Sequence, residues 1–214
     1  MSNKLVLYSC WTSSCSFRAR IALALKNLDY ELKCINLQKG EQKRQEYLAI
    51  NPNGMVPTLI HNGKVFSDSM AIIEYLDEKF PQPYKFLPED SESRAIVRAL
   101  SYSITTNVQP LHCLRVRNYH GQGNKQKADE WARYWIQIGN EAIERTLEKT
   151  AGKYAYGNSL TMADICIPPH VFNARDKFGI DMSSYPTISR LDKNLSGMQE
   201  IQGAHPTKQP DCNQ

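Results

Sequence analysis

The chain of 214 residues has no long hydrophobic run. No stretch approaches the roughly 18 consecutive apolar residues that a membrane helix needs. The first residues also lack the basic segment followed by an apolar run that marks a secretory signal. We therefore expect a cytoplasmic protein without a membrane partner.

The sequence also lacks the cysteine patterns of metal sites and redox motifs. Six cysteines are present, but none has zinc-finger or C-x-x-C spacing, so we predict no metal site and free, reduced thiols. Charge of one sign is not in strong excess either, because 26 Lys and Arg residues against 22 Asp and Glu residues give a net charge of +4. This charge is too small and too dispersed to indicate a nucleic-acid partner.

Strand and helix patterns alternate over roughly the first 80 residues, which is typical of an α/β sandwich. The order is β-α-β followed by β-β-α, and Asn62-Gly63 is a strong signal for a two-residue hairpin. The predicted elements are strands at Lys4–Ser9, Tyr30–Asn36, Thr58–His61 and Lys64–Ser67, and helices at about Ser14–Lys26 and Ser69–Lys79.

Three prolines, Pro81, Pro83 and Pro88, predict a stiff linker and a domain boundary. We therefore expect one domain at 1–81, a linker at 82–87 and a second domain at 88–214. After the linker only helical periodicity is present, which predicts an all-helical bundle. Two of its helices are expected at about Ser91–Asn118, with a kink at Pro110, and at Lys125–Lys149. A third begins at Thr161 with a capping box that includes Asp164, and a fourth covers Thr187–Leu195. Ile96 and Ile138 are among the expected core positions.

The segment between the first strand and the first helix carries the strongest chemical signal. Ser13, Ser14 and Cys15 fall at the start of the predicted helix. A helix start presents unpaired N–H groups and the positive end of the helix dipole, so these residues are suited to holding a thiolate. The thiolate belongs either to Cys15 or to a bound small thiol.

Two further positions point to a peptide ligand. A cis Val56–Pro57 bond leaves the Val56 backbone free to pair with an extended peptide, although a trans proline at an edge strand is the alternative. Asp68 and Ser69 open the next helix and either cap it or bind the amino-acid end of a ligand. A thiolate, a peptide backbone and an α-amino-acid end together describe glutathione.

These residues resemble a known family. The first domain is similar to the thioredoxin-like domain of cytosolic glutathione transferases, and the run from Ser13 to Leu23 resembles the signature of the zeta class, the maleylacetoacetate isomerases. The usual Arg-Val-Arg is replaced by Arg18-Ala19-Arg20. Similar motifs recur along nearly the whole chain, at Gln109-Pro110-Leu111, Thr161–Asp164, His205-Pro206 and Gln209-Pro210-Asp211.

The resemblance implies roles for individual residues. Ser13 is expected to be the principal donor to the glutathione thiol, with Ser14 and Cys15 beside it. The remaining glutathione-binding residues are expected to be Gln42, Val56 through its backbone, Asp68, Ser69 and Gln109.

The substrate side is less well matched to the family. Cys113 stands where relatives can have asparagine. Arg175 lies near the class's carboxylate-facing arginine, but its register is shifted by one residue, which is about 100° around a helix. His112, Arg115 and Arg117 follow Pro110 and can supply positive charge for a dianionic substrate, or form a basic surface.

The resemblance implies a homodimeric enzyme of tyrosine and phenylalanine breakdown. Glutathione thiolate adds to the cis double bond of maleylacetoacetate, a small dicarboxylate, and its later expulsion leaves fumarylacetoacetate. Maleylpyruvate isomerisation and dehalogenation of α-halo acids need the same thiolate and stay open as alternatives. So do a thiol transferase using Cys15 and a non-catalytic protein that only binds glutathione.

Overall fold

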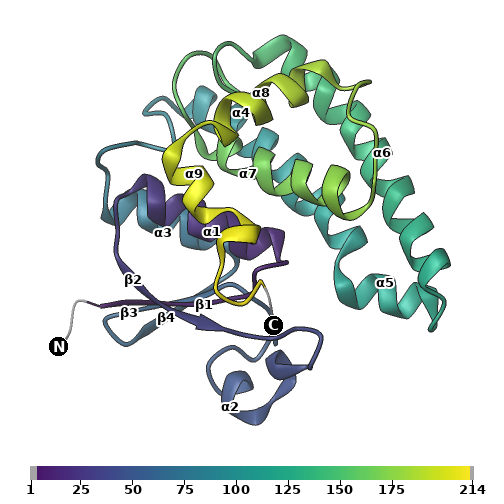
Figure 1. Ribbon diagram of the computed structural model, residues 1–214. Coiled ribbons are helices and arrows are strands. Elements are labelled where there is room, and N and C mark those ends of the chain that lie inside the picture. Colours follow the sequence, from purple (N-terminus) through teal and green to yellow (C-terminus); the bar gives the residue numbers. More distant parts are fainter. Residues whose placement is uncertain (1–3, 213–214) are drawn as a thin grey trace. The chain divides into compact units, whose positions relative to one another are not determined.

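The computed structural model describes residues 4–212, which form two compact units (Figure 1). The first unit combines the described residues up to Lys85 with those from Met198 onward. The second unit runs from Phe86 to Gly197.

The first unit is a four-stranded sheet with helices on both faces. The strand order is β2-β1-β3-β4, with β1 parallel to β2 and antiparallel to β3. Figure 1 shows α1 and α3 on one face of the sheet and α2 on the other. This arrangement confirms the predicted thioredoxin-like α/β fold. The elements are β1 (Leu5–Ser9), α1 (Ser14–Leu25), β2 (Tyr30–Cys34), the 3₁₀ turn η1 (Glu41–Lys43), α2 (Gln45–Leu48), β3 (Thr58–His61), β4 (Lys64–Ser67) and α3 (Ser69–Lys79).

Alternation along the strands builds the core of this unit. Leu7 of β1 and Leu59 of β3 are paired across the sheet and fully buried, as is Ile21 on α1. The hairpin between β3 and β4 is confirmed, since Asn62 and Gly63 both have positive φ angles of 51° and 74°. Such angles at both central residues give the turn whose twist matches that of the strands.

The C-terminal segment differs from the predicted domain division. The predicted domain at 88–214 included it, whereas α9 (Gln199–Ala204) and η5 (Pro206–Lys208) belong to the first unit, where α9 packs along α1. The buried Arg20 side chain explains this, because its Nε donates to the Ala204 carbonyl at 2.9 Å while Nη1 donates to Ser9 Oγ at 3.0 Å. At the other boundary, Phe86 of the predicted linker is fully buried in the second unit.

The second unit is helical, as predicted. Its elements are α4 (Ser91–Tyr102), the π-helical turn η2 (Ser103–Val108), the 3₁₀ turn η3 (Gln109–His112), α5 (Leu114–Gly121), α6 (Lys125–Thr150), α7 (Met162–Val171), the π-helical turn η4 (Phe172–Lys177) and α8 (Pro186–Ser196). The capping box at the start of α7 is confirmed, since Asp164 Oδ2 accepts the Thr161 N–H at 2.8 Å.

Two expectations for this unit are wrong. The helix expected over about Ser91–Asn118 is divided into α4, η2, η3 and α5, with Pro110 in the first turn of η3. Ile96 and Ile138 are 39% and 43% exposed instead of lying in the core. The periodicity predicts a buried stripe on α6 of Ala128, Trp131, Trp135, Ile138 and Ala142. Ala128 is buried, but Ala132, Ile136 and Ile143 are buried in place of the residues before them, and one residue is about 100° of rotation.

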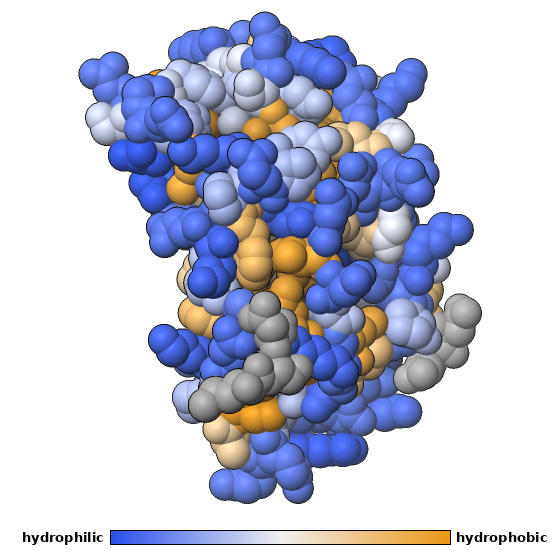
Figure 2. All heavy atoms as spheres, turned by 90° about the vertical axis from the view of Figure 1, so that its left-hand side faces the viewer, coloured by the Kyte–Doolittle hydropathy of each residue, from blue (hydrophilic) through white to orange (hydrophobic). Residues whose placement is uncertain are grey.

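No helix among residues 4–212 is both long enough and apolar enough to span a bilayer. Hydrophilic side chains cover most of the face drawn in Figure 2, and apolar residues are visible between them.

Candidate active site

Most of the predicted site residues meet at one end of the sheet in the first unit. Tyr8, Thr58 and Ser67 are neighbours across β1, β3 and β4. The segment after β1, the segment before β3 and the segment after β4 therefore begin within roughly 10 Å of one another. The segment after β2 joins them, because β2 is parallel to β1 and ends beside Ser9.

A tight turn delivers Ser13 to this end. The Ser13 N–H donates to the Cys10 carbonyl at 3.1 Å, which closes the turn after β1. Ser13 is then the N-cap of α1, and its Oγ accepts the Ser16 N–H at 3.2 Å. A hydroxyl that accepts one hydrogen bond still has its own proton to donate. Ser14, the first residue of the helix, is buried.

Cys15 lies beside these serines and is half-buried. The Arg18 guanidinium donates from Nη2 to Cys15 Sγ at 2.9 Å. Arg18 is 2% exposed, so it does not form part of a solvated basic surface. The contact fixes the Cys15 side chain at the start of the helix.

The loop before β3 has a cis Val56–Pro57 bond, one of the two alternatives that the sequence left open. The loop is held from behind by two residues that the sequence patterns did not single out. Tyr47 donates from its hydroxyl to the Met55 carbonyl at 2.6 Å, and Asn51 donates from Nδ2 to the same oxygen at 3.0 Å. Val56 itself is 6% exposed and packs with Tyr47 in a small apolar cluster.

Asp68 and Ser69 start α3. Asp68 Oδ1 accepts the Met70 N–H at 2.8 Å, so the capping role is confirmed. Asp68 also has a φ of 72°, which is uncommon for a non-glycine residue and costs conformational energy. Such strain is often found at binding sites. The Asp68 side chain is exposed, and Ser69 is buried.

Gln42 lies in η1, on the segment that follows β2. Its side chain is 9% exposed, and Nε2 donates to the Leu37 carbonyl at 3.5 Å. Gly54 has a φ of +58° and would bring a Cβ atom to 3.0 Å from the Gln42 carbonyl oxygen. A glycine at position 54 thus allows the loop before Val56 to approach the Gln42 backbone closely.

The other predicted site residues belong to the second unit. Gln109 is the first residue of η3 and is half-buried, Cys113 precedes α5, and Arg115 is exposed. Their roles stay predictions. His112 is not a source of positive charge, because burial lowers its pKa to about 3 and keeps the ring neutral at physiological pH.

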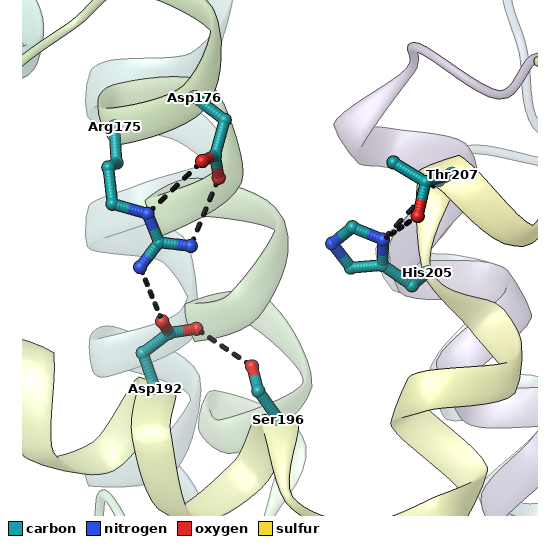
Figure 3. Close-up of polar contacts among 6 residues, drawn as sticks. All are labelled: Arg175, Asp176, Asp192, Ser196, His205 and Thr207. Atoms are coloured by element: carbon teal, nitrogen blue, oxygen red, sulfur yellow. Dashed lines mark hydrogen bonds and ion pairs between the residues drawn. The ribbon is translucent and has the colours of Figure 1, made fainter.

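Arg175 is already engaged by two carboxylates of its own unit. Its guanidinium lies 3.0 Å from Asp176 Oδ2 and 3.3 Å from Asp192 Oδ2 (Figure 3). Arg175 lies in the π-helical turn η4, where the Phe178 N–H donates to the Asn173 carbonyl five residues earlier. A π-helical turn accommodates an extra residue, which agrees with the shifted register of Arg175 in the sequence. A guanidinium held by two carboxylates is a poor receptor for a third.

Comparisons with known proteins agree with this geometry. The family model described as the N-terminal domain of glutathione S-transferases matches residues 12–79. The chain is 46% identical to a maleylacetoacetate isomerase of Rattus norvegicus over 98% of its length and 96% of that protein's length.

Two solved structures share the whole fold. One is a bacterial maleyl pyruvate isomerase in its holo form, a zeta-class glutathione S-transferase, with a TM-score of 0.92, 34% identity, and coverage of 96% of this chain and 99% of that one. The other is a maleylacetoacetate isomerase of Anaeromyxobacter dehalogenans with dicarboxyethyl glutathione and citrate in its active site. Its TM-score is 0.88 with 37% identity, covering 99% of this chain and 98% of that one. The chain therefore belongs to the glutathione S-transferase family, within the zeta class that contains the maleylacetoacetate isomerases.

Proposed function

We propose that the protein isomerises maleylacetoacetate to fumarylacetoacetate, with glutathione as the nucleophilic cofactor. The observation that carries the proposal is the convergence of three segments at one end of the sheet. They are the capped helix start at Ser13, the cis loop at Val56 and the helix start at Asp68. The chain's 46% identity to the rat maleylacetoacetate isomerase supports the choice of reaction.

Activation of the glutathione thiol is the first task of the site. A free thiol has a pKa of about 8.5, so only a few per cent is thiolate at neutral pH. Ser13 Oγ accepts the Ser16 N–H and donates its own proton to the sulfur. The first-turn N–H groups of Ser14 and Cys15 have no intrahelical acceptor and add positive potential. These donors favour the thiolate.

The rest of the glutathione molecule lies along the same end of the sheet. The Val56 backbone pairs with the cysteinyl part of the tripeptide, and Asp68 and Ser69 bind the γ-glutamyl amino-acid end. Gln42 and Gln109 add polar contacts. The strained backbone at Asp68 supports a binding role for this residue, because strain of this kind is retained where function needs it.

The reaction then needs no nucleophile from the chain. The thiolate forms a carbon–sulfur bond to one carbon of the cis double bond, and the electron pair moves into the conjugated carbonyl as an enolate. The former double bond is now single and rotates. The enolate electrons re-form the double bond in the trans geometry and expel the thiolate, so glutathione is regenerated. Positive charge near the enolate oxygen lowers the barrier, and we assign Arg115 rather than Arg175 to this charge.

Maleylpyruvate isomerisation is the second candidate. It uses the same addition, rotation and expulsion on a related cis-enone acid. The fold is shared with the maleyl pyruvate isomerase at a TM-score of 0.92, so the architecture suits this reaction as well. The ratio of kcat/KM values for the two substrates decides between them. From the family resemblance we also infer a homodimer and a cytoplasmic location.

The test follows the absorbance of maleylacetoacetate with and without glutathione. We expect the reaction to require glutathione, and Ser13→Ala to lower kcat/KM about 100-fold, the loss typical of removing one donor to a developing anion. Cys15→Ala is the matched control and retains the activity within about threefold of the parent, since no step uses its sulfur. Equal rates for the parent and Ser13→Ala contradict the role of Ser13. With oxidised glutathione as the added disulfide, attack of the Cys15 thiolate forms a Cys15–glutathione mixed disulfide and releases one glutathione; this product in the parent, and its absence in an inactive Cys15→Ala, indicates a thiol transferase instead.

A further inference from the structure

We propose that Asp211 is a positioning residue for the thiol site, holding the turn that delivers Ser13. The inference rests on the proposed function, because it concerns the same activated thiol. It arises from a contact across 200 residues of sequence, in which the Trp11 N–H donates to Asp211 Oδ2 at 2.9 Å. Asp211 is 8% exposed, so little water competes for this contact.

The turn between β1 and α1 depends on a few backbone hydrogen bonds. The Cys10 N–H donates to Ser16 Oγ at 3.3 Å, and the Ser13 N–H donates to the Cys10 carbonyl at 3.1 Å. Both bonds are local and tie the turn to itself and to α1. The Trp11 N–H bond to Asp211 ties the turn to a distant part of the unit. Trp11 is two residues before Ser13, so a shift of the turn moves the Ser13 hydroxyl.

Two further side chains lie beside the Asp211 carboxylate. The buried Arg20 guanidinium lies close enough to attract it. The Cys34 thiol donates to it, and burial together with the Asp211 charge raises the pKa of Cys34 to about 11, so this thiol keeps its proton. A charged acceptor forms a stronger hydrogen bond with an amide than a neutral one does.

The segment that carries Asp211 is itself fixed. Gln209 Nε2 donates to the carbonyls of Gly203 and His205 at 3.2 and 3.1 Å. His205 Nδ1 and Thr207 Oγ1 are 2.8 Å apart, a contact drawn in Figure 3, and the His205 ring packs edge-on against Phe17 of α1. These contacts fix the segment from Gly203 to Asp211 on α1. The Asp211 carboxylate therefore has a fixed position from which it can hold the turn.

The turn also has space to move if this contact is lost. A pocket of about 130 Å³ is lined by Trp11, Thr12 and Asp211, among other residues. Close packing therefore does not confine the turn on this side. A hydroxyl that drifts by a fraction of an ångström donates a weaker hydrogen bond to the sulfur, because hydrogen-bond strength falls with distance and misalignment.

The experiment compares Asp211→Ala, Asp211→Asn and the parent. Asparagine keeps one oxygen that can accept the Trp11 N–H, whereas alanine keeps none. We measure the pKa of bound glutathione by following the ultraviolet absorbance of the thiolate against pH, which needs no substrate. In Asp211→Ala we expect this pKa to rise by about one unit and kcat/KM to fall about tenfold, with the KM for glutathione changed less than about threefold. Asp211→Asn should recover most of both effects.

Asp181→Ala is the control, since Asp181 is an exposed carboxylate of the second unit. It should leave the thiol pKa and kcat/KM unchanged. If alanine and asparagine at position 211 lower activity equally, while the thiol pKa stays at the parent value, the positioning role is wrong and Asp211 only stabilises the fold. If Asp211→Ala does not fold, Asp211→Glu takes its place, because the added methylene displaces the carboxylate from the Trp11 N–H: a thiol pKa above that of the parent supports positioning, and a value equal to the parent's overturns it.

The two proposals fail in different ways. A parent that lowers the pKa of bound glutathione but does not isomerise maleylacetoacetate refutes the proposed substrate and leaves the role of Asp211 intact. A parent that does not lower this pKa at all refutes both.

Discussion

At the scale of single residues, the buried His112 makes the stability of the folded chain sensitive to acid pH. His112 is 4% exposed, and burial lowers its pKa from 6.5 to about 3. The unfolded chain binds a proton at His112 near pH 6.5, whereas the folded chain resists it. The stability that the neutral ring contributes is therefore complete above pH 6.5 and is lost as the pH falls toward 3.

Replacing His112 by glutamine should flatten this acid sensitivity. The parent is expected to lose about 2 kcal/mol of unfolding free energy through His112 between pH 6.5 and about pH 4.5, and His112→Gln should lose correspondingly less. Urea unfolding at several pH values measures the difference. His120→Gln, at the less buried histidine whose ring is tilted against Trp131, serves as the control variant. A constant gap between the parent and His112→Gln over this range contradicts the assignment.

At the scale of the elements, one close approach explains a glycine within the longest helix. Gly139 lies in α6 beside Val108 of η2, where an added Cβ would lie 2.2 Å from Val108 Cγ2 and 3.2 Å from its Cβ. Valine has a restricted χ1 angle and cannot simply turn away. We expect Gly139→Ala to cost about 1–3 kcal/mol of unfolding free energy, in spite of alanine's higher helix propensity.

Two variants make this prediction specific. Val108→Ala in the Gly139→Ala background should recover part of the loss, because it removes the atoms in conflict. Gly203→Ala in α9 meets nothing within 4 Å and should be neutral or stabilising by up to about 1 kcal/mol. Thermal unfolding of the four proteins tests this, and equal effects of the two glycine substitutions contradict the packing explanation.

The sequence predicts elements well where the signal is local. The hairpin at Asn62-Gly63 and the cap at Asp68 depend on residues within a few positions of each other, so their chemistry is visible in the sequence. The helix over Ser91–Asn118 is predicted less well, because π-helical and 3₁₀ turns have no period that distinguishes them from an α-helix over so few residues. The one-residue error on α6 has the same origin, since a single residue rotates the buried face by about 100°.

In the candidate site, too, the residues with a local signal are predicted and those that depend on distant contacts are not. Ser13, the cis bond at Val56 and Asp68 are adjacent to strand ends, and strand order brings such ends together. The support behind them is not local. Tyr47 directly follows residues 39–46, which are charged and poor in apolar residues, and Asp211 is 200 residues from the amide that it holds. Long-range contacts of this kind follow from tertiary packing, which no window of the sequence contains.

At the scale of the whole molecule, the chain returns to its first unit after completing the second. The fully buried Arg20 guanidinium makes the main polar contacts that hold the C-terminal segment on the first unit. It donates hydrogen bonds to the Ala204 carbonyl, Ser9 Oγ and the Cys10 carbonyl. Burial lowers the Arg20 pKa to about 10, which still leaves it charged at neutral pH. Removing it leaves these buried acceptors without their donor, which typically costs several kcal/mol.

Arg20→Met should therefore release the tail before it affects the second unit. Methionine fills much of the space of the arginine stem but donates no hydrogen bond, so α9 loses its tie to β1 while α1 keeps its apolar contacts. We expect faster amide hydrogen exchange over Gln199–Ala204 and the first turn of α1, with exchange in α6 and α7 unchanged because these helices belong to the other compact unit.

Arg190→Met removes an exposed arginine of the second unit and should leave exchange in α9 at the parent level. Uniformly faster exchange in all of these helices would mean that the two units unfold as one, and the role assigned to Arg20 would then be wrong.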